Sequence, residues 1–221
     1  MKAIIVDISF YEAFFKVHYT KGFRLTYPMP LPTSVAGIFG SMLGIDRGRL
    51  KYEFKGMYFG AGLRSYDGII VENETFVQYK SGRVEKGVVH TQVINHPRYL
   101  LAMAGEDSKV AQYCKLLEDE GLAYLPYGGQ NDFFVEDVNL MGFSEVAEKS
   151  IVGNYAPQDM VEGVESKEAV FNILPVMHNY SENPNFYFIL EGSLRLKRPV
   201  ETVERDIKIA VFPLEMFRLV Y

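Results

Sequence analysis

The chain has 221 residues, of which 48% are hydrophobic and 23% charged, so it can form a folded core and is not intrinsically disordered. A formal net charge of −5 argues against a free-standing nucleic-acid binder, and a single cysteine excludes an internal disulfide. No apolar run is long enough to cross a bilayer and one cysteine suits a reducing compartment, so we expect a cytoplasmic protein with no membrane partner.

The chain opens with a predicted strand and a stiff connection. Residues 2–10, "KAIIVDISF", are dense in β-branched residues and predict a buried strand, which residues 12–19 extend or pair with. In "LTYPMPLPTSVAGIFGSMLGI", residues 25–45, Pro28, Pro30 and Pro32 fix φ and remove backbone donors, which predicts an extended segment. Thr33 is the expected N-cap of the helix that follows.

That helix has one bulky face and one small face. The apolar face is spaced at i, i+3, i+4, i+7 and i+8, and consists of Val35, Ile38, Phe39, Met42 and Leu43. Gly37 and Gly40 lie between these residues and cost the helix about 1 kcal/mol each relative to alanine. The small face therefore predicts a close approach, either by another part of the chain or by a bound partner.

A long hairpin is predicted in the next section of the chain. Residues 51–65 read as a strand, and residues 65–96 contain turn signals at Asp67-Gly68, Glu72-Asn73 and 79–83. These signals indicate a β-hairpin arm inserted between two strands of the main sheet. The arm is too polar to be buried in its own domain, so we expect it to become ordered only against a partner.

The remaining elements complete an α+β pattern. Strands are predicted at 98–105 and 133–143, a helix at 106–121, and a glycine-containing loop at 123–134. The order up to residue 143 is the βαββαβ order of a ferredoxin-like or RRM-type domain. Residues 144–184 read as polar and irregular, and strands at 185–197 and 206–221 close a β-rich C-terminal part. We therefore expect two parts, residues 1–143 and 144–221. Such sheets often bind RNA, although the fold alone does not decide function.

Two stretches carry a family resemblance. "YPMPLPTSVAGIFGSMLGI" resembles the N-terminal signature of the CRISPR-associated Cas five family, and "YLPYGGQNDFF" at 124–134 resembles the glycine-containing loop of the wider RAMP superfamily. The resemblance covers most of residues 1–143. It implies a subunit of a type I Cascade complex in antiviral defence that caps the 5′ handle of CRISPR RNA. It also implies contacts to a Cas seven backbone subunit and the large subunit, with the hairpin arm as a thumb.

Two other functions stay open at this point. One branch of the family, in type I-C systems, cuts precursor CRISPR RNA without metal and usually carries a tryptophan-containing motif after the first helix. Here that helix runs into "LGIDRGRLKYEF" and the chain has no Trp, so the resemblance is nearer to types I-A and I-B and to a non-catalytic subunit. The first alternative is a metal-independent endoribonuclease, and the second is a scaffold subunit that contacts only protein.

The candidate RNA-binding residues form three groups. Residues 1–60 contain eight Lys/Arg and four Asp/Glu, whereas residues 101–170 contain four Lys/Arg and fourteen Asp/Glu. We therefore expect the basic surface near the N-terminal helix, although ordinary solvent-exposed faces give the same pattern. Cations that can neutralise or grip phosphates flank that helix or the hairpin tip. The loop offers an aromatic ring, backbone N–H groups and amides that suit an unpaired base. The groups are Lys21, Arg24, Arg47 and Arg49; Lys80, Arg83 and Lys86; and Tyr127, Gly128, Gly129, Gln130 and Asn131.

Catalysis would depend on a histidine. Metal-free RNA cleavage needs a general base and a general acid, and His90 with Lys86 and Tyr79 is the candidate set. Glu136 and Asp137 are adjacent, so a strand places them on opposite faces and they make a poor metal site. No cofactor or metal motif is present in the sequence, and we expect neither.

Overall fold

A computed structural model describes residues 1–17, 22–175 and 185–216, and it is a strand-rich α+β protein, as predicted. The helices are α1 (Pro32–Met42), α2 (Leu50–Glu53) and α3 (Asp107–Glu120), with 3-10 turns η1 (Arg47–Arg49), η2 (Gln158–Met160) and η3 (Leu214–Met216). The strands are β1 (Lys2–Phe10), β2 (Glu12–Ala13), β3 (Phe15–Lys16), β4 (Phe23–Arg24), β5 (Thr26–Tyr27), β6 (Tyr58–Ser65), β7 (Gly68–Lys80), β8 (Arg83–Asn95), β9 (Arg98–Gly105), β10 (Val135–Val152), β11 (Tyr155–Pro157), β12 (Val161–Pro175), β13 (Asn185–Glu204), β14 (Lys208–Ala210) and β15 (Phe212–Pro213).

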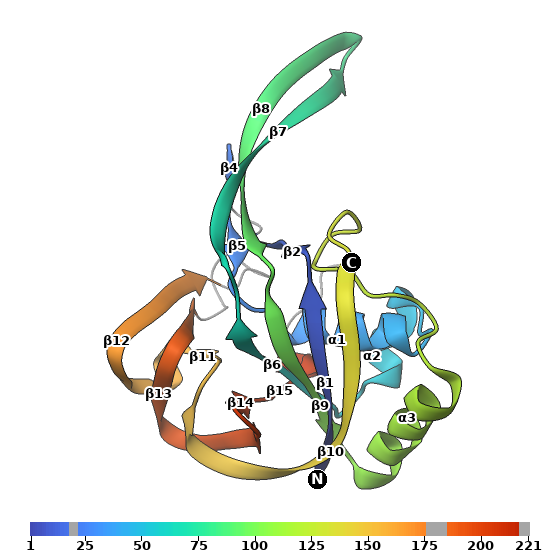
Figure 1. Ribbon diagram of the computed structural model, residues 1–221, viewed down its shortest axis with the longest axis vertical. Coiled ribbons are helices and arrows are strands. Elements are labelled where there is room, and N and C mark those ends of the chain that lie inside the picture. Colours follow the sequence, from blue (N-terminus) through green and yellow to red (C-terminus); the bar gives the residue numbers. More distant parts are fainter. Residues whose placement is uncertain (18–21, 176–184, 217–221) are drawn as a thin grey trace.

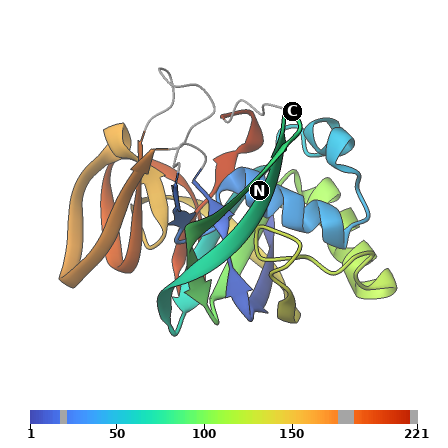
Figure 2. The same cartoon turned by 90° about the horizontal axis from the view of Figure 1, so that it is seen from above.

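One curled sheet organises the body of the molecule. Its strands run in the order β11-β13-β10-β1-β9-β6-β15, and β12 and β14 also pair with β13. The four central strands, β10-β1-β9-β6, are antiparallel to their neighbours. Helix α1 lies in the chain between β1 and β6, and α3 lies between β9 and β10. Figure 1 shows the β7–β8 hairpin projecting from this body, and Figure 2 shows β12 and β13 at one end with the helices toward the other.

The main core lies between the central strands and helix α1. On β1, Ile4 and Ile8 alternate with residues of the opposite face, as strand geometry requires. On α1, Val35, Phe39 and Met42 have at most 1% of their surface exposed, so the predicted helical face is confirmed. Because both patterns are set by spacing along a single element, they could be read from the sequence.

The proline segment is fixed by two buried tyrosines. Tyr99 Oη on β9 donates to the carbonyl of Pro28 at 3.1 Å, and Tyr155 Oη on β11 donates to the carbonyl of Pro30 at 3.2 Å. Burial raises the pKa of both phenols, so both hydroxyls remain donors. The prolines remove backbone donors, and the tyrosines bind carbonyls that such a segment would otherwise leave without partners.

Helix α1 begins two residues earlier than predicted, at Pro32 instead of Ser34, and Thr33 is not its cap. Leu31 occupies the N-cap position without a side-chain hydrogen bond, and Pro32 is the first helical residue. Proline suits this position because its missing N–H would have no intrahelical acceptor there. The expectation for Thr33 was wrong because the proline, and not a side-chain cap, starts the helix.

The small face of α1 has a partner within the chain. A Cβ on Gly40 would lie 2.3 Å from Leu50 Cδ2, whereas a Cβ on Gly37 would meet nothing within 4 Å. Leu50 begins helix α2, so the strand predicted over 51–65 starts only at Tyr58. A tight contact with Leu50 accounts for Gly40 and leaves Gly37 unexplained.

A second layer covers the other face of the central strands. A Cβ on Gly60 of β6 would lie 2.3 Å from the carbonyl oxygen of Ala210, and one on Gly62 would lie 3.1 Å from Ile207. Asn154 joins the two layers, because its side chain bonds to the backbone of both Ala61 and Ala210. The glycines allow β14 and its flanking residues to lie directly against β6.

The prediction that residues 144–184 are irregular was wrong for the described part of that range. Strand β10 runs on to Val152, and β12 spans Val161–Pro175. Exposed and partly buried residues alternate along most of β10, so its polar residues mark a solvent-facing side and not a loop. The proposed boundary at residue 143 falls inside β10, and residues 176–184 lie outside the described residues.

The single cysteine gives a clean chemical test of this packing. Cys114 on α3 is buried, and burial together with Glu118 raises the pKa of its thiol from 9.0 to about 11. Because the thiolate is the nucleophile, we expect iodoacetamide to label native Cys114 about 100-fold more slowly than an ordinary thiol. Denaturant should restore the ordinary rate, and rapid labelling of the native chain would contradict the buried placement of α3.

Candidate nucleic-acid interface

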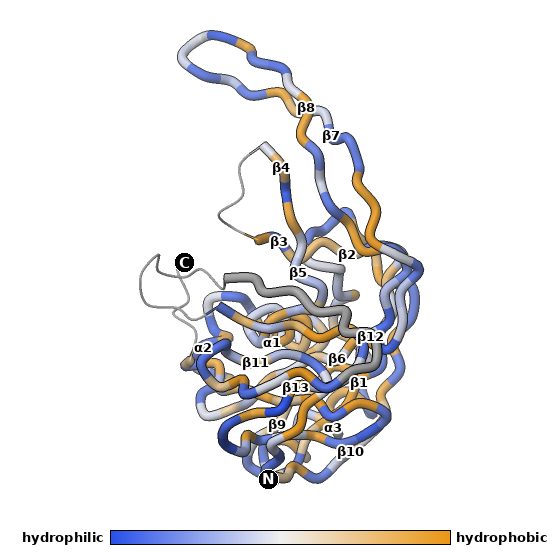
Figure 3. Tube along the Cα trace, turned by 90° about the vertical axis from the view of Figure 1, so that its left-hand side faces the viewer, coloured by the Kyte–Doolittle hydropathy of each residue, from blue (hydrophilic) through white to orange (hydrophobic). Residues whose placement is uncertain are grey.

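The hairpin arm is the most prominent exposed feature. Strands β7 and β8 pair from Gly68 with Asn95 to Lys80 with Arg83. Ser81 and Gly82 close the arm with φ values of +44° and +78°, and positive φ at both central residues is typical of a two-residue hairpin turn. The structure therefore contains the predicted arm, and Figure 3 shows hydrophobic residues interspersed with hydrophilic ones along it.

The register gives the arm two chemically different faces, because directly paired residues point to the same side. We call one the valine face; it consists of Val71, Asn73, Thr75, Val77, Tyr79, Val84, Lys86, Val88, His90 and Gln92. The other is the glutamate face; it consists of Glu72, Glu74, Phe76, Gln78, Lys80, Arg83, Glu85, Gly87, Val89 and Thr91. The valine face has no carboxylate, and the glutamate face has three.

The three cations predicted at the tip do not share one surface. Lys80 and Arg83 are paired on the glutamate face, where Lys80 Nζ lies 3.9 Å from Glu85 Oε2. Lys86 lies opposite Val77 on the valine face. A single phosphate chain following one face of the arm would therefore meet either Lys86 or the other two.

The candidate catalytic side chains are separated along the arm. Tyr79, Lys86 and His90 all lie on the valine face. Four residues along β8 place His90 about 13 Å from Lys86, and Tyr79 lies farther from His90 than Lys86 does. His90 Nδ1 instead lies 2.6 Å from Asn73 Oδ1. The three groups are thus not gathered around one reacting phosphate. Two other histidines, His18 and His178, lie outside the described residues.

The cations around α1 are also dispersed. Arg24 Nη1 lies 2.6 Å from Glu74 Oε2 at the base of the arm, and Arg49 forms an ion pair with Glu53. Arg47 is exposed in η1, at the opposite end of α1 from Arg24. Lys21 lies outside the described residues. The structure therefore brings Arg24 to the arm but leaves Arg47 and Arg49 near the end of the helix.

The glycines of the 124–134 loop serve a contact within the chain. A Cβ on Gly128 would lie 2.7 Å from the carbonyl oxygen of Glu12, and one on Gly129 would lie 2.1 Å from that of Phe14. The N–H of Phe14 donates to the carbonyl of Gly128 at 2.7 Å. The loop is thereby fixed against residues 12–15.

The rings of this region remain accessible. Tyr127 is 47% exposed and forms an isolated bridge with Phe134, which is 67% exposed, while Gln130 is partly buried and Asn131 is exposed. Phe134 was not among the residues predicted from the sequence, because its neighbours in the chain do not distinguish an exposed ring from one in the core. A base that reached this loop could meet two rings and one exposed amide side chain.

Three carboxylates lie on one side of the arm's base. The pKa of Glu72 is raised from 4.5, first by burial and then by Glu12 and Glu74. A raised folded-state pKa means that the charged form weakens folding, so this cost is absent below pH 4.5 and develops as the pH rises.

We therefore expect Glu72→Gln to increase the free energy of unfolding by up to about 0.5 kcal/mol at neutral pH, after solvent screening, and not in acid. Urea unfolding at about pH 7 and about pH 4 measures this difference. Glu85→Gln is the matched control, because Glu85 lies near Lys80 on the same face and should give no gain. An equal gain from both substitutions, or one that persists in acid, would contradict the carboxylate cluster.

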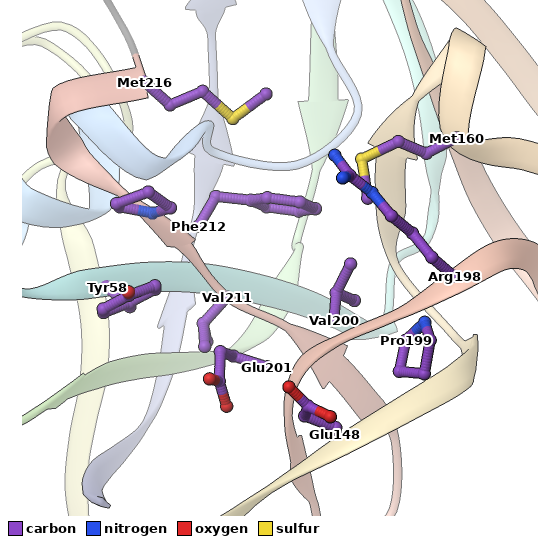
Figure 4. A pocket seen from close by; sticks show the side chains of 11 residues that line it. Tyr58, Glu148, Met160, Arg198, Pro199, Val200, Glu201, Val211, Phe212 and Met216 are labelled. Carbon is purple, nitrogen blue, oxygen red and sulfur yellow. The ribbon is translucent and has the colours of Figure 1, made fainter.

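A separate hollow of about 370 Å³ lies between β10, β13 and β15 (Figure 4). Glu148 and Glu201 are register partners at its edge, and Phe212 and Met216 line its apolar part. None of the predicted RNA-binding residues lines this hollow. Among the residues that the structure describes, no group of three His, Cys, Asp or Glu side chains could hold a metal ion. Within the same residues, no helix is both long and apolar enough to cross a membrane.

Comparison with known proteins identifies the fold. No family model matches the chain, and no curated protein matches it. Among solved structures, a chain titled "CRISPR RNA-guided surveillance complex" is 13% identical, with a TM-score of 0.53 and coverage of 91% of each chain. A "CRISPR protein from Archaeoglobus fulgidus" is 12% identical, with a TM-score of 0.53 and coverage of 95% of this chain and 99% of that one. The chain therefore shares the fold of these CRISPR proteins.

Proposed function

We propose that this chain is a non-catalytic subunit, of the Cas five kind, of a type I CRISPR RNA-guided complex. In this role it binds and caps the 5′ handle of CRISPR RNA in antiviral defence in the cytoplasm. The observation that carries the proposal is the fold shared along 91% of both chains with a protein of a CRISPR RNA-guided surveillance complex. The 25–45 segment and the projecting arm support the assignment to the Cas five kind, nearer to types I-A and I-B.

The strand order supports a ferredoxin-like, RRM-type domain of the RAMP superfamily for residues 1–143. The central strands lie in the order β10-β1-β9-β6. The connection that contains α1 leads from β1 to β6, and the connection that contains α3 leads from β9 to β10, so each crosses one intervening strand of the same sheet. Residues 144–221 then form the β-rich C-terminal part. The RNA handle, a Cas seven backbone subunit and the large Cascade subunit are the proposed partners.

The separation of His90 from Lys86 and Tyr79 favours binding over cutting. We expect precursor repeat RNA to remain intact when it is incubated with the chain in EDTA. Specific cuts that disappear in His90→Ala would replace this proposal with the endoribonuclease.

The binding test compares handle RNA with scrambled RNA at two salt concentrations, using the chain with and without its neighbouring subunits. Because the free chain has a net charge of −5, we expect modest, strongly salt-dependent binding alone and selective binding in the assembled complex. The proposal fails if the assembled complex binds both RNAs equally. Crosslinking that yields protein adducts and no RNA adducts would indicate a protein-only scaffold.

A further inference from the structure

We propose that the base of the valine face binds one unpaired RNA base through Phe23, Asn73, His90 and Gln92. This inference rests on the proposed RNA-binding function and names a contact within it. It differs from the grip by Lys80, Arg83 and Lys86 predicted from the sequence, because the register divides those cations between two faces.

Two aromatic rings form the centre of this site. Strand β4 runs parallel to β8 and places Phe23 beside His90, with ring centroids 6.2 Å apart and an interplanar angle of 38°. Phe23 is 38% exposed and His90 is exposed, so each ring has accessible surface. Accessible rings held in place by a sheet are the means by which many proteins stack unpaired bases.

Hydrogen-bonding groups border the rings. Asn73 Oδ1 accepts a hydrogen bond from His90 Nδ1 at 2.6 Å, which leaves the Asn73 amide N–H groups and His90 Nε2 for another partner. Gln92 is two residues beyond His90 on β8 and lies on the same face. Amide side chains donate and accept together, so they can bind the edge of a base that a neighbouring ring stacks.

The charge distribution favours RNA on this side of the arm. The valine face has no carboxylate to repel phosphate, and Lys86 lies about 13 Å farther along it, within reach of the same strand of RNA. Phosphates on the opposite side would meet Glu72 and Glu74. The aliphatic residues nearer the tip suit a protein contact, whereas the aromatic and amide groups at the base suit a nucleobase.

The test measures binding of fluorescein-labelled oligouridylate to the full chain by anisotropy. Phe23→Leu keeps the apolar bulk but removes the aromatic ring, and we expect it to weaken binding about 5- to 150-fold with an unchanged salt slope. Phe23→Tyr should bind like the original chain. Lys86→Ala should reduce the salt slope by about one phosphate contact.

Phe76→Leu is the matched control. Phe76 is 40% exposed but lies on the glutamate face, so its replacement should leave RNA affinity unchanged. Thermal unfolding of each variant confirms that the fold is retained, and the half-exposed position of Phe23 makes this the expected outcome.

Several outcomes would overturn the inference. Normal RNA affinity of Phe23→Leu, or equal losses in Phe23→Leu and Phe76→Leu, would remove this site and leave the proposed function standing. If Phe23→Leu no longer assembles with a neighbouring protein subunit but binds RNA normally, this surface is a protein-docking surface instead. If neither the original chain nor its assembled complex binds RNA, the proposed function itself fails.

Discussion

Replacing Asn154 with alanine should lower the melting temperature by about 10 °C, because the change removes a polar bridge between the two layers. The Asn154 side chain is fully buried. It donates to the carbonyls of Ala61 and Ala210 at 3.0 Å each and accepts from the N–H of Ala210 at 2.9 Å. Each buried group left without a partner costs about 1–3 kcal/mol, so we expect a loss of about 3–5 kcal/mol that is less than fully additive.

Asn139→Ala is the control for this experiment. Asn139 is an exposed residue of β10, and its replacement should change stability by less than about 0.5 kcal/mol. Both variants should unfold in one cooperative transition, because Asn154 and the curled strands β10 and β13 join residues before and after 143. Equal effects of the two substitutions, or two separate transitions in the original chain, would contradict this coupling.

The elements that could be predicted are those encoded by spacing over a few residues. Strand β1, strand β9 and the apolar faces of α1 and α3 follow from local patterns, and burial confirms them. The arm follows from its turn chemistry at Asp67-Gly68 and Ser81-Gly82. The division of Lys86 from Lys80 and Arg83 was also within reach of the sequence. A two-residue turn at Ser81-Gly82 fixes every cross-strand pair, and therefore every face.

What could not be predicted depends on contacts between distant segments. From the sequence alone, Gly60 and Gly62 are poor strand formers, and their role follows only from the contact of β6 with β14 and its flanking residues. The contact between Leu50 and Gly40 likewise cannot be predicted from the residues around either position. Strand β10 reads as irregular because polar residues occupy its exposed side. The candidate site has the same limit, since Phe23 and His90 are 67 positions apart in the sequence numbering and meet only through the parallel pairing of β4 with β8.

The glycines of the 124–134 loop give the second large expected effect. Gly129→Ala should destabilise the chain by about 2–5 kcal/mol, from about 1–2 kcal/mol for a left-handed backbone and about 1–3 kcal/mol for overpacking. The backbone of Gly129 has φ +98°, and its new Cβ would lie 2.1 Å from the carbonyl oxygen of Phe14. Because that atom belongs to a backbone whose N–H binds Gly128, it cannot move without breaking the contact.

Gly56→Ala separates the two causes. Gly56 has a similarly positive φ of +73°, but a Cβ there would meet nothing within 4 Å, so only the backbone cost of about 1–2 kcal/mol should remain. Urea unfolding of both variants measures the difference, and equal losses would mean that the loop does not lie against residues 12–15. RNA binding of the folded variants then tests the loop's role, because we expect the clash in Gly129→Ala to displace Tyr127 and Asn131, whereas a Cβ on Gly56 meets no atom and should leave them in place. A loop that binds RNA should lose affinity only in Gly129→Ala, and equal affinity in both variants would remove the loop from the proposed RNA contacts.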